Sequence, residues 1–166
     1  AAELAAGGAL VEVRVGAGVY EPDRDEANPD GTDDTAATFM MIDGVGIEGG
    51  YAGFGAPDPD ERNTSTYVSV LSGAIGQPHM FDNSMHVVTA MNLPLPQVPH
   101  LDGVVVSGGF AANGDDGGAG ILVIEGELHI DSCIVEGNTA VGAGGGLDAR
   151  GARVVANATI FRGNAS

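Results

Sequence analysis

The last third of the chain contains two copies of one short segment. Residues 128–140 return as the similar segment 154–166, and in both copies a run containing β-branched residues leads into a Gly-Asn pair. A cluster of glycines precedes each copy, at 117–120 and again at 142–146. The period is about 26 residues, and a period of this length, built from short strands and tight turns, restricts the chain to a stack of similar units, each of which contacts its neighbours.

Among stacked-repeat folds, a parallel β-helix fits this period best. Each of its coils makes two or three short strands, and successive coils stack at the sheet spacing of ~4.8 Å. Leucine-rich repeats have a similar length, but they need a regular frame of leucines that this sequence lacks. We therefore predict an all-β fold, a right-handed parallel β-helix (a solenoid) with about 26 residues per coil.

Stacking would place equivalent residues of the two copies directly above one another. Val135 is then expected to lie on Phe161 inside the coil, and Asn138 on Asn164 at the turn. Asparagine tolerates the left-handed backbone that such a turn needs, and its amide can hydrogen-bond to the next amide along the stack. The repeat thus predicts an internal apolar column beside a column of asparagines.

The rest of the chain shows the same short apolar runs and turns, interrupted by long inserted loops that are polar or rich in proline. These loops lie at 21–38, 52–66, 76–85 and 91–99. Because they fall before the regular repeats begin, we expect coils of unequal length in the N-terminal half of the protein.

We predict a single β-helix domain over residues 1–166. Its parts are an N-terminal cap at about 1–9, irregular coils over 10–100 and regular coils over 101–166. The second copy of the repeat stops where another glycine cluster would begin. We therefore expect a piece of a longer chain, in which further coils or other subunits cover the exposed edge of the last coil.

The charge balance narrows the choice of partners. Six basic residues, all of them arginine, stand against 23 acidic residues, which gives a net charge of −17. Such a charge repels nucleic acid and anionic membranes, and no apolar stretch has the length of a membrane span. Carboxylate oxygens suit calcium, so Ca²⁺ is the cofactor that this composition favours. The single cysteine, Cys133, lies in an apolar run and is interpreted as a small buried hydrophobe.

Five segments resemble motifs of a known family, and they occur in the same order as in that family. They are 13–20, 39–51, 71–76, 82–88 and 101–109. Together they resemble the right-handed parallel β-helix repeat proteins of the pectin-lyase-like superfamily, of the secreted or surface-displayed bacterial type, although Ala74 stands where that family usually has an aspartate. The resemblance implies the fold and an extracellular or cell-surface location on a bacterium. It implies no particular activity, because this fold carries many functions.

The candidates for catalytic chemistry are His129, Asp131 and Arg150. Glycan lyases and hydrolases on this fold place carboxylates and basic groups on one exposed strand face, and His129 and Asp131 point outward if Leu128 and Ile130 point inward. Further charged groups nearby are Glu125, Glu127, Asp148 and Arg153. Of these, the glutamate at 127 and the arginine at 153 lie one repeat apart and are expected to pair. The alternative is a solvated outer face without chemistry.

A calcium site is predicted in the acidic loop near residue 30, with Asn28, Asp30, Asp33 and Asp34 as ligands. Oxygen-bearing side chains there alternate before a glycine, as in calcium loops, but no bidentate glutamate follows at the required distance. The alternative is a solvated acidic turn. Other candidates are Asp58, Asp60, Glu61, Asp115 and Asp116 for calcium, and His79, Asp82 and His86 for zinc.

The sequence leaves more than one class of function open, and it leans away from an enzyme. The first hypothesis is a non-catalytic extracellular structural or adhesive β-solenoid, part of a larger surface protein or assembly and steadied by calcium. The alternative is a carbohydrate-active enzyme, either a polysaccharide lyase or a glycoside hydrolase. A glycan-binding solenoid is a third hypothesis, although the sequence has no tryptophan and only three tyrosines for sugar platforms.

Overall fold

The strands of this protein pair almost entirely in parallel, as a stacked-coil fold requires. The computed structural model describes residues 11–76, 78–93, 95–113 and 117–166. Its elements are β1 (Val11–Gly16), β2 (Gly18–Tyr20), β3 (Phe39–Met40), β4 (Val45–Tyr51), β5 (Ser69–Ser72), the 3-10 helix η1 (Met80–Asp82), β6 (Val88–Met91), β7 (His100–Asp102), β8 (Val104–Ser107), β9 (Phe110–Ala111), β10 (Ile121–Asp131), β11 (Ile134–Glu136), β12 (Thr139–Ala140), β13 (Leu147–Asn157) and β14 (Ile160–Arg162). The predicted all-β class is confirmed.

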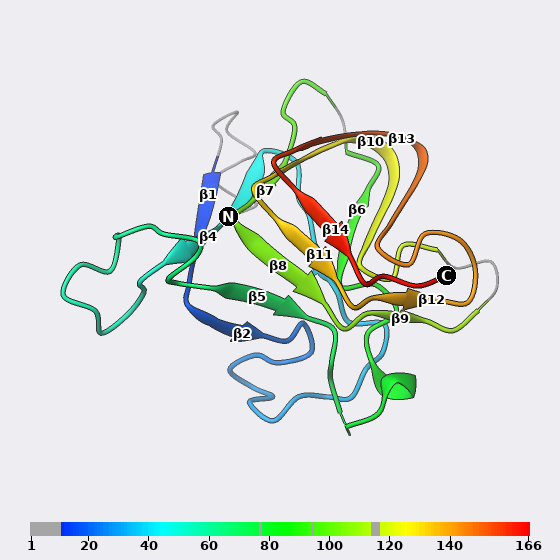
Figure 1. Cartoon of the computed structure of the whole chain (residues 1–166), viewed down its shortest axis with the longest axis horizontal. Helices are drawn as coiled ribbons and strands as arrows, with labels where there is room; N and C mark the ends of the chain where they lie inside the picture. The colour runs from blue at the N-terminus through cyan, green and yellow to red at the C-terminus, as the bar shows by residue number, and fades with distance from the viewer. Residues whose placement is uncertain (1–10, 77, 94, 114–116) are drawn as a thin grey trace.

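The strands form three sheets that share the same direction of stacking. A five-stranded sheet has the order β2-β5-β8-β11-β14, so its strands follow one another in chain order, and Figure 1 shows them side by side from blue to red. A seven-stranded sheet has the order β1-β4-β7-β10-β6-β3, with β13 paired to β10, and β9 and β12 form a small third sheet. All the ladders between these strands are parallel.

The seven-stranded sheet curls because β10 bends in its middle. The N-terminal part of β10 pairs with β6, and its C-terminal part pairs with β7. Glu125 and Gly126, which lie between the two parts, both have positive φ angles, 53° and 105°. A Cβ atom on Gly126 would lie 2.5 Å from the carbonyl oxygen of Leu93, so only glycine fits this bend. β13 follows β10 around the same bend, as Figure 1 shows.

The spacing between paired strands is not uniform, which corrects the prediction of one constant coil length. The regular spacing of the repeat is kept where β10 pairs with β13, as Ile121 with Leu147, and where β11 pairs with β14. The partners lie further apart in the sequence where β7 pairs with β10, and further still where β5 pairs with β8 and β4 with β7. The inserted loops lengthen the earlier connections, so a single period describes only the C-terminal end.

The predicted apolar column lies inside the stack. Val106, Val135 and Phe161 are in register on β8, β11 and β14, which confirms the expected pairing of Val135 with Phe161. The first two side chains have no exposed surface, whereas Phe161 on the last strand is 44% exposed. Leu101 and Ile130 form a parallel buried pair on β7 and β10. The burial of apolar side chains between neighbouring parallel strands is the main driving force that holds these strands together.

The predicted asparagine column is confirmed and forms a chain of hydrogen bonds. The side-chain oxygen of Asn138 accepts a hydrogen bond from the Gly109 amide at 2.9 Å, and its side-chain nitrogen donates to the Val106 carbonyl at 3.1 Å. The side-chain oxygen of Asn164 accepts from the backbone and side-chain nitrogens of Asn138 at 3.1 and 3.0 Å. Each asparagine therefore ties its own segment to the preceding parallel strand, Asn138 to β8 and Asn164 to β11.

Cys133 is a buried member of the core, and burial raises the pKa of its thiol to about 11. Thiolate is the reactive form, so the native protein is expected to react with iodoacetamide at pH 8 far more slowly than the urea-unfolded chain does. Mass spectrometry of the alkylated protein over time checks this prediction. Equal rates in the native and unfolded states would contradict it.

The N-terminal cap predicted at about 1–9 lies outside the described residues. Among the residues that the structure describes, no helix has the length and apolarity needed to cross a membrane.

Candidate functional site

The alternation of β10 places His129 and Asp131 on the outer face of the seven-stranded sheet. Leu128 and Ile130 have no exposed surface and belong to the core, so the residues between and after them point outward. This orientation is the one that the sequence predicted for the two candidates.

Parallel pairing extends both residues into rows across successive strands. His129 is in register with His100 on β7, and Asp131 is in register with Asp102 on the same strand. Asp102 is in turn in register with Glu48 on β4. Adjacent strands in a sheet lie about 4.8 Å apart, so these side chains form one continuous surface. We call Glu48, His100, Asp102, Glu127, His129 and Asp131 the polar face.

Gly46 explains how a histidine fits into this surface. It lies opposite His100 on the neighbouring strand, and a Cβ atom at this glycine would lie 2.1 Å from the His100 ring. The ring therefore covers the backbone of β4 at Gly46. From that position the His100 Nε2 atom lies 3.8 Å from the carboxylate of Glu48.

Glu127 on the polar face pairs with two side chains. Its Oε1 atom accepts a hydrogen bond from His129 Nε2 at 2.8 Å, and the same atom pairs with the Arg153 guanidinium of β13. The hydrogen bond from His129, followed by the positive charge of Arg153, lowers the pKa of Glu127 despite its partial burial. The expected pairing of Glu127 with Arg153 across one repeat is confirmed.

A tyrosine and two arginines lie next to the polar face, near Glu48 and Asp102. The Tyr51 hydroxyl donates a hydrogen bond to Glu48 at 2.7 Å, and this bond raises the pKa of Tyr51. The guanidinium groups of Arg14 and Arg62 lie 5.4 and 5.6 Å from the centre of the Tyr51 ring, within cation–π range. Arg62 also forms an ion pair with Asp102 at 3.0 Å.

Arg150 does not join the other catalytic candidates. It is in register with Ile124, on the far side of the bend in β10 from His129, and its Nε atom pairs with Asp148 at 2.7 Å. Asp131 instead accepts a hydrogen bond from Asn157 at 2.8 Å. The structure therefore places His129 and Asp131 together on the polar face and Arg150 apart from them, and a catalytic role for these residues stays a prediction.

Three of the predicted calcium ligands, Asn28, Asp33 and Asp34, make separate local hydrogen bonds. Asn28 donates hydrogen bonds to Asp25, and Asp34 accepts one from the Ala36 amide at 2.9 Å. Asp33 has a positive φ angle of 56°, and its amide donates to Asp23. The carboxylates that organise this loop are thus Asp23 and Asp25, which sequence reasoning missed. Among the described residues no group of three or more metal-binding side chains is close enough to hold an ion.

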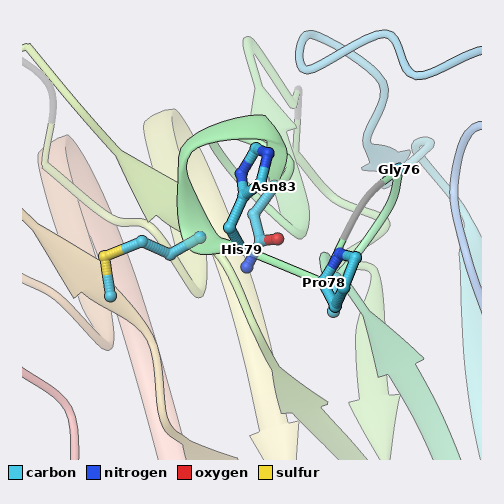
Figure 2. Close-up of a pocket in the computed structure, with 6 residues that line it drawn as sticks. Gly76, Pro78, His79 and Asn83 are labelled. Atoms are coloured by element: carbon cyan, nitrogen blue, oxygen red, sulfur yellow. The ribbon is translucent and has the colours of Figure 1, made fainter.

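The zinc candidates are likewise separated. His79 Nδ1 lies 3.1 Å from Asp82 Oδ1, but the His86 ring bonds at 3.0 Å to the carbonyl oxygen of Gly118. His79 instead lines an open cleft of about 470 Å³ together with Ala74, Gly76, Pro78, Met80 and Asn83. Figure 2 labels four residues of this cleft: Gly76, Pro78 and His79 precede η1, and Asn83 directly follows it.

Sequence reasoning missed half of the polar face. The missed residues are Glu48, His100 and Asp102, and their positions follow from pairings between strands that are distant in the sequence, β4 with β7 and β7 with β10. The usable signal was the alternation of apolar and polar residues in each short strand. That alternation gives the outward positions, but it does not give the register between strands separated by long loops.

No protein-family model, no curated protein and no solved structure matches the chain. The polar face is therefore interpreted from its own geometry.

Proposed function

We propose that this chain is part of a right-handed parallel β-helix of the pectin-lyase-like kind, with a non-catalytic structural or adhesive role outside a bacterial cell. In this proposal the coils serve as a scaffold within a larger surface protein or assembly. The strongly negative charge favours solubility and disfavours nucleic acid as a partner. The motifs described above support both the fold and the location.

The edge formed by β13 and β14 is the observation that carries this proposal. Among the described strands, β14 pairs only with β11, and β13 only with β10. Ile160 and Phe161 on β14 are half exposed, although the residues beneath Phe161 in its column are fully buried. An open strand edge beside exposed apolar side chains is a ready site for pairing with another strand. In the proposed assembly, the strand that covers this edge belongs to another subunit.

Self-association tests this proposal directly. The chain is expected to associate in a concentration-dependent manner in analytical ultracentrifugation, and Phe161→Glu is expected to shift the population towards monomer. The charge would be buried at the new interface at a high cost. Phe54→Glu is the matched control, because Phe54 is fully exposed on an inserted loop away from β14. A wild-type chain that stays monomeric at all concentrations would contradict the proposal.

The enzyme alternative is supported by the polar face alone. It has carboxylates and imidazoles in adjacent rows, which could act as acids and bases on a glycan. Glu127 and His129 bond to each other, however, and Asp102 bonds to Arg62. Such pairs also occur in structural networks, so we place this alternative second. Calcium stays a prediction that unfolding with and without chelator can test.

A further inference from the structure

A groove runs beside the polar face, between one inserted loop and the corners of the coils. Its first part has a volume of about 410 Å³ and is lined by Arg62, Asn63, Thr64, Asp102 and Ser132. Its second part, of about 290 Å³, shares the threonine and the serine and continues over Ser65, Val68, Gly103, Val104, Val105 and Ile134. Ligand sites commonly measure ~300–1,000 Å³. The two adjoining parts therefore offer room for an extended small ligand.

The wall of the groove is held in place by the backbone of the neighbouring coils. Arg62 Nε donates a hydrogen bond to the Gly49 carbonyl at 3.0 Å, and the Asn63 amide donates to the Gly50 carbonyl at 2.7 Å. Thr64 packs so closely on Gly103 that a Cβ atom there would lie 2.6 Å from its methyl group. Gly103 also has a φ angle of +67°. The groove is thus formed before any ligand arrives, which lowers the entropic cost of binding.

One end of the groove offers paired donors and acceptors. Arg62 Nη2 lies 3.0 Å from Asp102 Oδ2, and both side chains are only partly exposed. A guanidinium has five N–H donors and a carboxylate about four acceptor positions. Contacts within the described part of the chain engage the Nε and Nη2 atoms of the arginine and one oxygen of the aspartate. The remaining capacity suits neighbouring hydroxyl groups of a ligand, and two hydroxyl-bearing residues, Thr64 and Ser132, line the same end of the groove.

The other end of the groove is apolar. Val68, Val105 and Ile134 are partly or well exposed there, although two of them belong to the sheet. A hydroxyl-binding surface next to an apolar surface matches a sugar, which carries both hydroxyl groups and C–H groups. The Arg62–Asp102 pair is neutral as a whole, and the net charge of −17 repels polyanions. These features select an uncharged saccharide over an acidic one.

We infer that this groove binds a neutral oligosaccharide, with Arg62 and Asp102 holding adjacent hydroxyl groups. The inference rests on the adhesive part of the proposed function and gives it a ligand class. It does not depend on what covers β14, because the groove and that edge share no lining residue. Failure of one test therefore leaves the other intact.

Binding to a panel of immobilised oligosaccharides tests the inference. The panel contains neutral gluco-, manno-, galacto- and xylo-oligosaccharides, and oligosaccharides of uronic acids as the acidic counterpart. The wild-type chain is expected to bind at least one neutral member. Asp102→Asn is expected to weaken that binding about tenfold, because it removes one charge-assisted hydrogen bond. Ser132→Ala is expected to weaken binding by a smaller factor.

The control variant is Asp148→Asn. Asp148 also pairs with an arginine, at 2.7 Å, but it lies on β13 outside the groove, so its replacement is expected to leave binding unchanged. Thermal unfolding of each variant verifies that the fold is intact. The inference is overturned if no neutral oligosaccharide binds, if only acidic ones bind, or if Asp102→Asn and Ser132→Ala both bind as the wild type does.

Discussion

Replacing Ile130 with alanine is expected to lower the free energy of unfolding by about 2–5 kcal/mol. Its side chain has no exposed surface and packs within the main hydrophobic core, in register with Leu101 on the coil below and Ala156 on the coil above. The loss combines the lost transfer free energy of the removed methyl and methylene groups with a cavity that close-packed neighbours cannot fill.

Ile160→Ala is the matched control for this change. The same atoms are removed, but Ile160 is 50% exposed on the edge strand β14. Its loss is expected to stay near or below ~1 kcal/mol, since half of the side chain already contacts water. Urea denaturation of the two variants measures both values. Equal losses would mean that β10 does not lie between two neighbouring coils in solution.

Asn138→Ala is expected to cost nearly as much, although this side chain is polar. Asn138 is fully buried, and its amide satisfies the Gly109 N–H and the Val106 carbonyl of the preceding coil. Removal takes away both of these bonds, and each buried backbone group that then lacks a partner costs about 1–3 kcal/mol. It also removes its side-chain bond to Asn164. For the two backbone groups together we expect a loss of at least ~2 kcal/mol.

Asn157→Ala separates this effect from the general effect of removing an asparagine. Asn157 is exposed and its side chain makes one hydrogen bond, to Asp131 at 2.8 Å, so a loss below ~1 kcal/mol is expected. Chemical denaturation again supplies the measurement. If both alanine variants are equally stable, the asparagine column does not join the coils.

The features that could be predicted from the sequence depend on the repeat of residues 128–140 at 154–166. Because the two copies lie on adjacent strands, the pairing of Val135 with Phe161 and of Asn138 with Asn164 followed from simple alignment. The outward direction of His129 followed from strand alternation. Local periodicity was sufficient wherever the connection between coils stayed short.

The remaining features depend on the register across long loops, which no local pattern contains. His100 faces Gly46 although the two are distant in the sequence, and the loop carrying Arg62 lies within that interval. In the loop near residue 30, the carboxylates of Asp23 and Asp25 accept hydrogen bonds from backbone N–H groups. The number of acidic residues alone could not distinguish these two carboxylates from solvated ones. The conformation of such a loop depends on which side chains hydrogen-bond to its backbone. Residue types show which of these bonds are possible, but they do not show which ones form.

If the proposed β-helix is right, the C-terminal coil is a stacking unit that can be repeated. Its most direct test is the thermal unfolding of a chain to which a second copy of residues 141–166 is added after Ser166. The control carries a scrambled copy of the same segment. In a solenoid an added coil buries the exposed Phe161 and contributes its own interface, so stability rises with coil number. We predict a single transition with a midpoint at least ~4 °C above the control, which corresponds to about 1–2 kcal/mol. A midpoint equal to that of the scrambled control would contradict the account.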